Sequence, residues 1–149
     1  MILPSDCQKK YGNPYDEKHI VMWDVPQEIE LGIIPNKLYC NEDLIEPLSR
    51  VFRNIINRGC LGNNNDILVR TTDVLKTWDG CFNIRKIRGS DSMSLHSWGV
   101  AVDVNAAWNQ FGKKPSMGII LVSCFTDEGF DWGGYWRNPD GMHFQLSKI

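Results

Sequence analysis

The clearest periodic pattern in the chain is a stripe of apolar residues between positions 41 and 58. Its members recur at steps of three and four, which places them on one face of a helix: Leu44, Leu48, Val51, Phe52, Ile55 and Ile56. Asn41 is a suitable cap for the start of this helix, and Gly59 follows its end. Pro47 is tolerated only in a first turn, so we expect the regular helix to begin near Glu46.

A second pattern, strict alternation, predicts a strand between Val100 and Val104. The valines occupy every second position and face one side, so Ala101 and Asp103 face the other. Gly99 and Ala101 are small, which leaves room beside the Asp103 carboxylate for a metal ion. His96 precedes the strand in a turn that contains Ser and Gly, and this turn can fold its ring back over the same space.

Alternation also predicts a strand from His143 onward, with His143 and Gln145 on one face. His96, Asp103 and His143 together form a ligand set suited to zinc, which binds imidazole nitrogen and carboxylate oxygen at about 2.0–2.2 Å. Catalytic zinc sites use three protein ligands and leave a position for water. Asp140 lies close before His143 and can reach the site without being a ligand, so it is the candidate general base.

The remaining elements are less regular. We expect an irregular wrapping segment over 1–40, with a short strand at 33–39, then a strand at 67–71, a strand within 78–88 that buries Phe82 and Ile84, a loop at 108–115 and a buried helix over 116–125. The predicted fold class is α+β, with a small antiparallel sheet that carries the metal site on one face and helices packed on the other. The 149 residues form one domain, with the catalytic core in 41–149.

Composition and charge exclude some classes of function. The chain is 42% hydrophobic and 23% charged, which is ordinary for a globular protein. A net charge of -2 and the lack of a basic run argue against a nucleic-acid partner. The first residues, Met1 to Asp6, lack the pattern of a signal peptide, and no apolar run reaches membrane-spanning length. We therefore expect a cytoplasmic chain with no stable membrane association.

Five cysteines are present, an odd number without a C-x-x-C pair. This spacing fits neither a disulfide framework nor a thiolate zinc site, so we interpret them as reduced residues, mostly in the core. A cysteine nucleophile is the alternative, but both motif histidines are better explained as metal ligands.

The run S-x-H-x-x-G-x-A-x-D, which starts at Ser94, and the later run D-x-M-H-F, which starts at Asp140, resemble the M15-type family of zinc D-Ala-D-Ala carboxypeptidases and L-alanyl-D-glutamate endopeptidases. The small phage endolysins of this family are the most similar. The likeness continues upstream through Gly80-Cys81-Phe82, Arg85 and Arg88-Gly89, and downstream through 129–134.

This resemblance implies further site residues. An arginine before the first histidine grips the substrate carboxylate and steadies the oxyanion in such enzymes; Arg85 is the preferred candidate and Arg88 the second, and a solvated strand end is the alternative for each. Ser94 matches a substrate-contacting position, or it simply caps the turn. Independently of the resemblance, Trp132 and Trp136 either line a groove for peptide or glycan or are buried at the edge of the site.

The function implied by the resemblance is zinc-dependent hydrolysis of an amide bond in the peptidoglycan stem peptide. The bond between L-Ala and D-Glu is favoured, and a D-Ala-D-Ala carboxypeptidase is the nearest alternative. As an endolysin, the chain would stay in the host cytoplasm until its release to the cell wall, and would act as a monomer with Zn²⁺ as its cofactor. A rival of another class is a non-catalytic zinc-containing module for wall binding or assembly.

Overall fold

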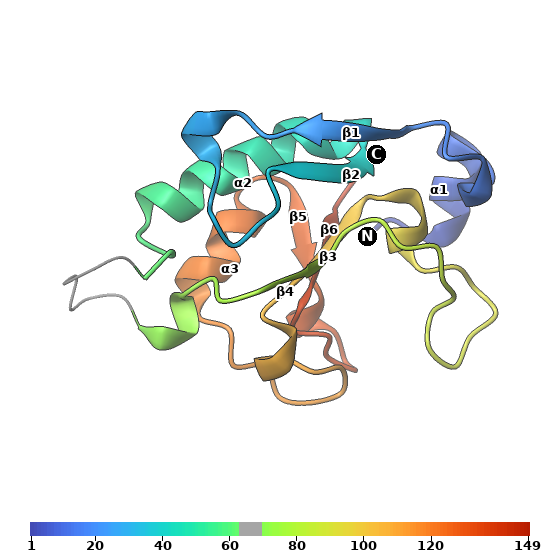
Figure 1. Ribbon diagram of the computed structural model, residues 1–149. Helices are drawn as coiled ribbons and strands as arrows, with labels where there is room; N and C mark the ends of the chain where they lie inside the picture. The colour runs from blue at the N-terminus through green and yellow to red at the C-terminus, as the bar shows by residue number, and fades with distance from the viewer. Residues whose placement is uncertain (63–69) are drawn as a thin grey trace.

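A computed structural model describes residues 1–62 and 70–149 (Figure 1). It is an α+β fold with two antiparallel sheets, one of two strands and one of four, which confirms the predicted class. The helices are α1 (Pro4–Tyr11), α2 (Ile45–Asn57) and α3 (Ile119–Thr126), and the strands are β1 (Ile20–Asp24), β2 (Lys37–Asn41), β3 (Trp78–Gly80), β4 (Ala101–Val104), β5 (Phe130–Trp132) and β6 (His143–Leu146). None of the helices in the described part is long and apolar enough to span a bilayer.

The first forty residues are more regular than we expected. They contain α1, β1 and most of β2, and β1 pairs antiparallel with β2 from Ile20–Asn41 to Asp24–Lys37. The expectation of an irregular segment was therefore wrong, because this pairing depends on contacts that alternation within either strand does not reveal. The strand expected at 33–39 begins only at Lys37, beyond Pro35, which cannot donate to a ladder.

Helix α2 begins where the prolyl ring allows. The Asn41 side chain accepts a hydrogen bond from the Asp43 amide and starts a short 3₁₀ turn, Glu42–Leu44. The α-helix proper starts at Ile45, so Pro47 falls in its first turn, as predicted. The buried residues of the helix all belong to the predicted stripe.

The four-stranded sheet has the order β3-β4-β6-β5. Asp103 of β4 stands directly opposite His143 of β6, so two predicted ligands share one face of neighbouring strands. The strand predicted within 78–88 ends early, at Gly80. Phe82 and Ile84 are only half-buried, and the buried residue of this stretch is Cys81.

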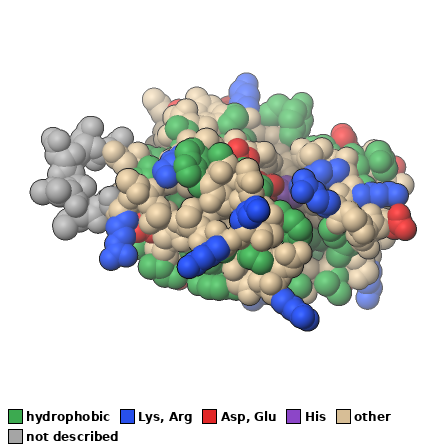
Figure 2. Space-filling view, turned by 90° about the horizontal axis from the view of Figure 1, so that it is seen from below, with side chains coloured by type: hydrophobic (Ala, Val, Ile, Leu, Met, Phe, Trp, Pro, Cys, Tyr) green, Lys and Arg blue, Asp and Glu red, His purple; other side chains and the backbone are tan. Residues whose placement is uncertain are grey.

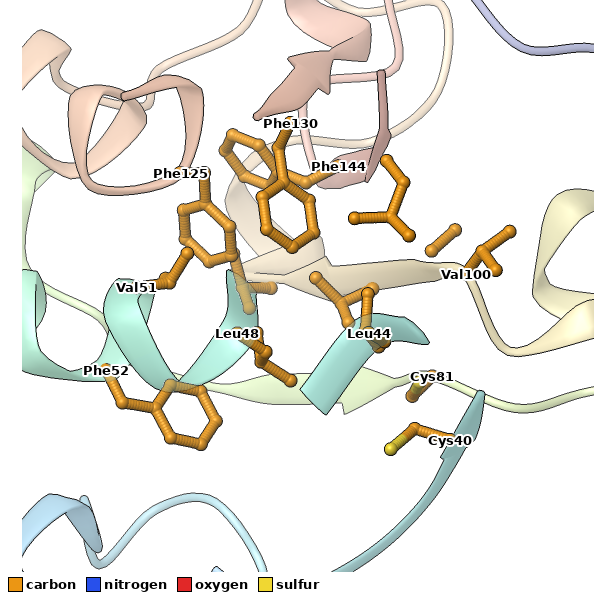
Figure 3. Close-up of a cluster of buried hydrophobic side chains, with 14 of the residues drawn as sticks. Cys40, Leu44, Leu48, Val51, Phe52, Cys81, Val100, Phe125, Phe130 and Phe144 are labelled. Carbon is orange, nitrogen blue, oxygen red and sulfur yellow. The ribbon is translucent and has the colours of Figure 1, made fainter. Parts of the chain in front are cut away.

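The opposite face of the sheet carries the core (Figure 3). The rings of Phe125 in α3 and Phe144 in β6 stack with centroids 4.0 Å apart. In α2, Phe52 contacts Trp23 of β1 on one side and Trp78 of β3 on the other. Helix α2 thus lies between the two sheets. Helices α2 and α3 cover the face away from the predicted ligands, as expected, whereas α1 lies against the 95–98 turn. All five cysteines, each within the described ranges, are free and buried.

Helix α3 begins later than predicted, at Ile119, and its amino-terminal cap comes from elsewhere in the chain. The Oδ1 atom of buried Asp73 accepts hydrogen bonds from the amides of Ile120 and Leu121, at 2.9 and 3.1 Å. Asp73 belongs to a 3₁₀ turn, Thr71–Asp73. The strand expected at 67–71 lies largely outside the described residues; its described end, Arg70 and Thr71, leads into this turn.

Candidate metal centre

Three side chains from three elements converge on one point. His96 lies in a 3₁₀ turn, Leu95–Trp98, which Ser94 caps by accepting from the His96 amide. Gly99 ends the turn with φ 67°, and a Cβ there would lie 2.7 Å from the Asn41 backbone nitrogen. The turn is thereby fixed against β2, and His96 faces Asp103 and His143. One ligand atom of each lies within 4.8 Å of the others.

The contacts within this cluster suit a shared cation better than direct hydrogen bonds. The Oδ1 atom of Asp103 lies 3.2 Å from His96 Nε2 and 3.3 Å from His143 Nδ1. Two ligand atoms at about 2.0–2.1 Å from a tetrahedral zinc ion are roughly 3.3 Å apart. Asp103 Oδ1 and His96 Nε2 are buried without a hydrogen-bond partner in the described part of the chain. Buried polar atoms rarely stay unsatisfied, so the cluster fits a zinc ion that the three residues would hold.

The other nitrogen of each ring is held by a hydrogen-bond acceptor. His96 Nδ1 lies 2.7 Å from the carbonyl oxygen of Cys81, which can only accept, so Nδ1 carries the proton and Nε2 presents its lone pair to the cluster. His143 Nε2 lies 3.0 Å from Gln145 Oε1. Such outer contacts orient metal-binding imidazoles.

The charges of the cluster stabilise one another when no metal is bound. Burial raises the pKa of Asp103, but the neighbouring rings of His143 and His96 outweigh burial and hold this pKa below its usual value. Burial lowers the pKa of His143, yet the Asp103 carboxylate outweighs this effect and the net pKa of His143 is raised. The negative charge of Asp103 and the two imidazole rings are thus electrostatically complementary within the cluster.

Asp140 lies beside the cluster without belonging to it. Its amide donates to the Gly133 carbonyl (2.9 Å), and its own carbonyl accepts from the His143 amide (3.1 Å). Its Oδ1 atom is buried and has no hydrogen-bond partner in residues 1–62 and 70–149. Burial raises the pKa of Asp140; the charge of His143 opposes this shift and that of Asp103 adds to it. A carboxylate with a raised pKa and a free oxygen can accept a proton.

Asp103 and His143 line a cavity of about 440 Å³, within the usual size range of ligand sites. Figure 2 shows histidine surface in a hollow with Lys and Arg side chains beside it. Polar and charged lining residues other than the ligands are Arg85, Arg88, Ser94, Asp140 and Gln145, and apolar ones are Ile87, Leu95, Phe111, Trp136 and Met142. One cavity thus combines a basic part, an acidic part and an apolar wall.

The structure brings most of the predicted site residues to this cavity. Ser94 both caps the turn and lines the cavity. Trp136 lines the cavity, with its ring 5.4 Å from that of His143. Trp132 is buried, does not line the cavity and donates from Nε1 to the Gly141 carbonyl. The alternative given for Trp132, a buried aromatic at the edge of the site, describes its place.

Both arginines line the cavity, but they differ in their relation to Asp140. The charge of Arg85 lowers the pKa of Asp140, partly offsetting burial, so this guanidinium acts on the carboxyl across the cavity. The Arg85 backbone is held by Ser97, whose hydroxyl donates to its carbonyl. Arg88 lies further along, in the turn that follows. Both guanidinium groups are therefore available to the same cavity, and the charge of Arg85 reaches the Asp140 carboxyl.

Sequence reasoning missed part of the cavity wall and the contacts behind the ligands. Phe111 comes from the loop predicted at 108–115, and no local pattern marks it as part of the cavity wall. The Cys81 carbonyl is a backbone group, which sequence does not single out. Gln145 had a detectable signal, because its alternation places it on the same face as His143.

Residues 88–146 match the model of a protein family described as D-alanyl-D-alanine carboxypeptidase. The matched region contains the three candidate ligands, Asp140 and Arg88. No curated protein and no solved structure matches the chain. The family match supports the M15-type resemblance and, in general terms, a metallopeptidase that acts on peptidoglycan.

Proposed function

We propose that this protein is a zinc-dependent peptidoglycan hydrolase that cleaves an amide bond of the stem peptide. The observation that carries the proposal is the convergence of His96 Nε2, His143 Nδ1 and Asp103 Oδ1. Two of these residues, Asp103 and His143, line a cavity that Asp140 also lines. Three ligands leave a position for water, as in catalytic zinc sites. A structural zinc site would require four protein ligands, and the described residues offer no fourth ligand in this group.

The residues around the ligands have separate roles in the proposed reaction. His96, Asp103 and His143 would hold the zinc ion, which would supply a bound water with a pKa of about 7 and a Lewis acid for the scissile carbonyl. Asp140 accepts the proton of the attacking water on its free Oδ1 atom and returns it to the leaving amine. Arg85 lines the same cavity, and in the proposed reaction its guanidinium stabilises the negative charge that develops on the carbonyl oxygen.

We propose the L-Ala–D-Glu bond as the site of cleavage, as in the phage endolysins that the motifs of this chain resemble. The second candidate is the terminal D-Ala–D-Ala bond, which the description of the matched family favours. In the first case the biological role is that of an endolysin, which reaches the cell wall of the host from its cytoplasm. Both reactions use the same ligands and base, so the distinction rests on the product.

The test is mass spectrometry of purified peptidoglycan after incubation with the zinc-loaded protein, beside a chelator-treated control. New fragments with a free D-Glu amino terminus establish the endopeptidase, and release of D-Ala establishes the carboxypeptidase. The variant Asp140→Asn keeps the size of the side chain but cannot take the proton, so it should keep its zinc and lose hydrolysis by about 10²–10⁴-fold. Hydrolysis at the full rate by this variant would refute Asp140 as the base.

The rival, a zinc-containing module without catalysis, makes a different prediction. Such a module would give no metal-dependent product from walls of several chemotypes, although it would bind zinc. That result would show that the protein is a non-catalytic binding module, and it would not change the proposed zinc ligands.

A further inference from the structure

The side chain of Gln145 joins a metal ligand to the beginning of the chain. Its Oε1 atom lies 3.0 Å from His143 Nε2, and its Nε2 atom donates to the carbonyl of Ile2 at 3.4 Å. Gln145 and Ile2 are 3% and 8% exposed, so water competes little for either contact. The amino-terminal segment and β6 thus meet behind the metal centre.

These two contacts determine the orientation of the amide and the tautomer of the histidine. The Ile2 carbonyl can only accept, so the amide nitrogen of Gln145 must face it and the amide oxygen must face His143. That oxygen in turn can only accept, so His143 carries its proton on Nε2. The remaining nitrogen, Nδ1, is the one that faces Asp103.

We propose that Gln145 is a positioning residue, which sets His143 to bind the metal through Nδ1 by accepting a hydrogen bond from its Nε2. This proposal rests on the proposed zinc site and extends it to the amino-terminal segment, whose Ile2 carbonyl orients the amide. His96 is held in the opposite tautomer by the Cys81 carbonyl, so its Nε2 atom is the ligand. The two rings thus present different nitrogens to the same point, each selected by a different acceptor.

The surroundings of Gln145 offer a discriminating substitution. Asp131 of β5 stands opposite Gln145 in the sheet, and its Oδ2 atom is buried without a hydrogen-bond partner from the described residues. A glutamate at position 145 would accept a hydrogen bond from His143 Nε2 whether its carboxyl group is ionised or protonated. In its protonated form, beside Asp131, it would also donate a hydrogen bond to the Ile2 carbonyl, as the Gln145 amide does. Gln145→Glu therefore keeps the acceptor. Gln145→Met keeps the approximate size of the side chain but removes the hydrogen-bond acceptor.

The test measures zinc affinity of the full chain by competition with a chromophoric chelator, which requires no hydrolysis. We expect Gln145→Met to weaken zinc binding by about 10–100-fold and Gln145→Glu to stay within about threefold of the wild type. The matched control is Asn54→Leu, which removes hydrogen bonds from α2 to the Cys124 carbonyl and to the Glu128 carboxylate. Asn54 does not line the cavity, so this variant should keep its zinc affinity although its melting temperature falls. Nitrogen-15 NMR of the zinc-bound wild type should show His143 with its proton on Nε2.

Several outcomes would overturn the proposal. Wild-type zinc affinity in Gln145→Met would do so, as would equal losses in the Met and Glu variants, because the acceptor would then not matter. An equal loss in the Asn54 control would assign the effect to a looser fold. If the wild type hydrolyses peptidoglycan and Gln145→Met binds zinc tightly, only the role of Gln145 is refuted. If zinc binding depends on Gln145 but the wild type hydrolyses nothing, only the proposed function is refuted. If the wild type binds no zinc, both are refuted.

Discussion

Replacing Gly133 by alanine should impair catalysis, although it adds a single methyl group. A Cβ at this position would lie 2.5 Å from the carbonyl oxygen of Asp140 and 3.1 Å from its Cβ. Ordinary contact begins near 3.4 Å, so the Asp140 backbone would have to move by about 0.9 Å. A displacement of about 1 Å in a catalytic group can cost 10²-fold in rate, and we expect a loss of this size in kcat/KM.

Stability and metal binding should respond less than the rate. Overpacking of this kind costs about 1–3 kcal/mol in the free energy of unfolding. Zinc affinity should fall by less than kcat/KM, because His143 is also held by its pairing with Asp103 across the sheet and by Gln145. The assay compares initial rates of fragment release at saturating zinc with thermal unfolding of the same preparations.

The control for this experiment is Ile55→Val, a change in the buried face of α2 that does not touch the cavity. It should cost about 0.5–1.5 kcal/mol in stability and leave the rate unchanged. If Gly133→Ala hydrolysed the substrate at the wild-type rate, Asp140 would not be held by this contact or would not be the base. An equal loss of rate in both variants would attribute the effect to stability.

Three further predictions concern the ligands and the arginines. His96→Ala should lose both bound zinc and hydrolysis, and undiminished zinc by metal analysis would reject the ligand set. Arg85→Ala should lower kcat/KM at least tenfold more than Arg88→Ala, because the charge of Arg85 acts on the Asp140 carboxyl; kinetics that rank the two in the reverse order would assign the role to Arg88. In the chelator-treated protein, the raised pKa of His143 contributes stability that is complete below its ordinary pKa of 6.5 and is lost as the pH rises through the higher folded value. Melting curves should therefore show a fall in stability above pH 6.5 that His143→Gln abolishes, and an unchanged slope in that variant would contradict the assignment.

The metal centre was predictable because its ligands are encoded in short, regular patterns. Alternation places Asp103 and His143 on the same kind of face in two strands, and the two strands then pair with these residues opposite each other. Helix α2 was predictable for the same reason, since its stripe and its proline constrain the start within a few residues. In each case the information is local.

Features that depend on distant partners were not predictable. The β1–β2 ribbon was not predicted, because its register depends on contacts between the two strands and not on the sequence of either one. The position of Phe111 in the cavity wall was not predicted, because it depends on the conformation of a loop. The strand before His96 was predicted to include Phe82 and Ile84, because their apolar side chains suggested that they are buried. The buried residue of this stretch is Cys81, which follows the end of the strand.

The cap of α3 has a consequence for how the protein folds. A helix of eight residues is too short to persist alone in water, and α3 lacks a side-chain cap at its own first position, Gly118. The missing acceptor is the carboxylate of Asp73, which is distant in sequence. We therefore expect helix α3 to form together with the docking of the 71–73 turn. Phe125 of this helix stacks on Phe144 of β6, so the Asp73 contact should couple the 71–73 turn to the core beneath the metal face.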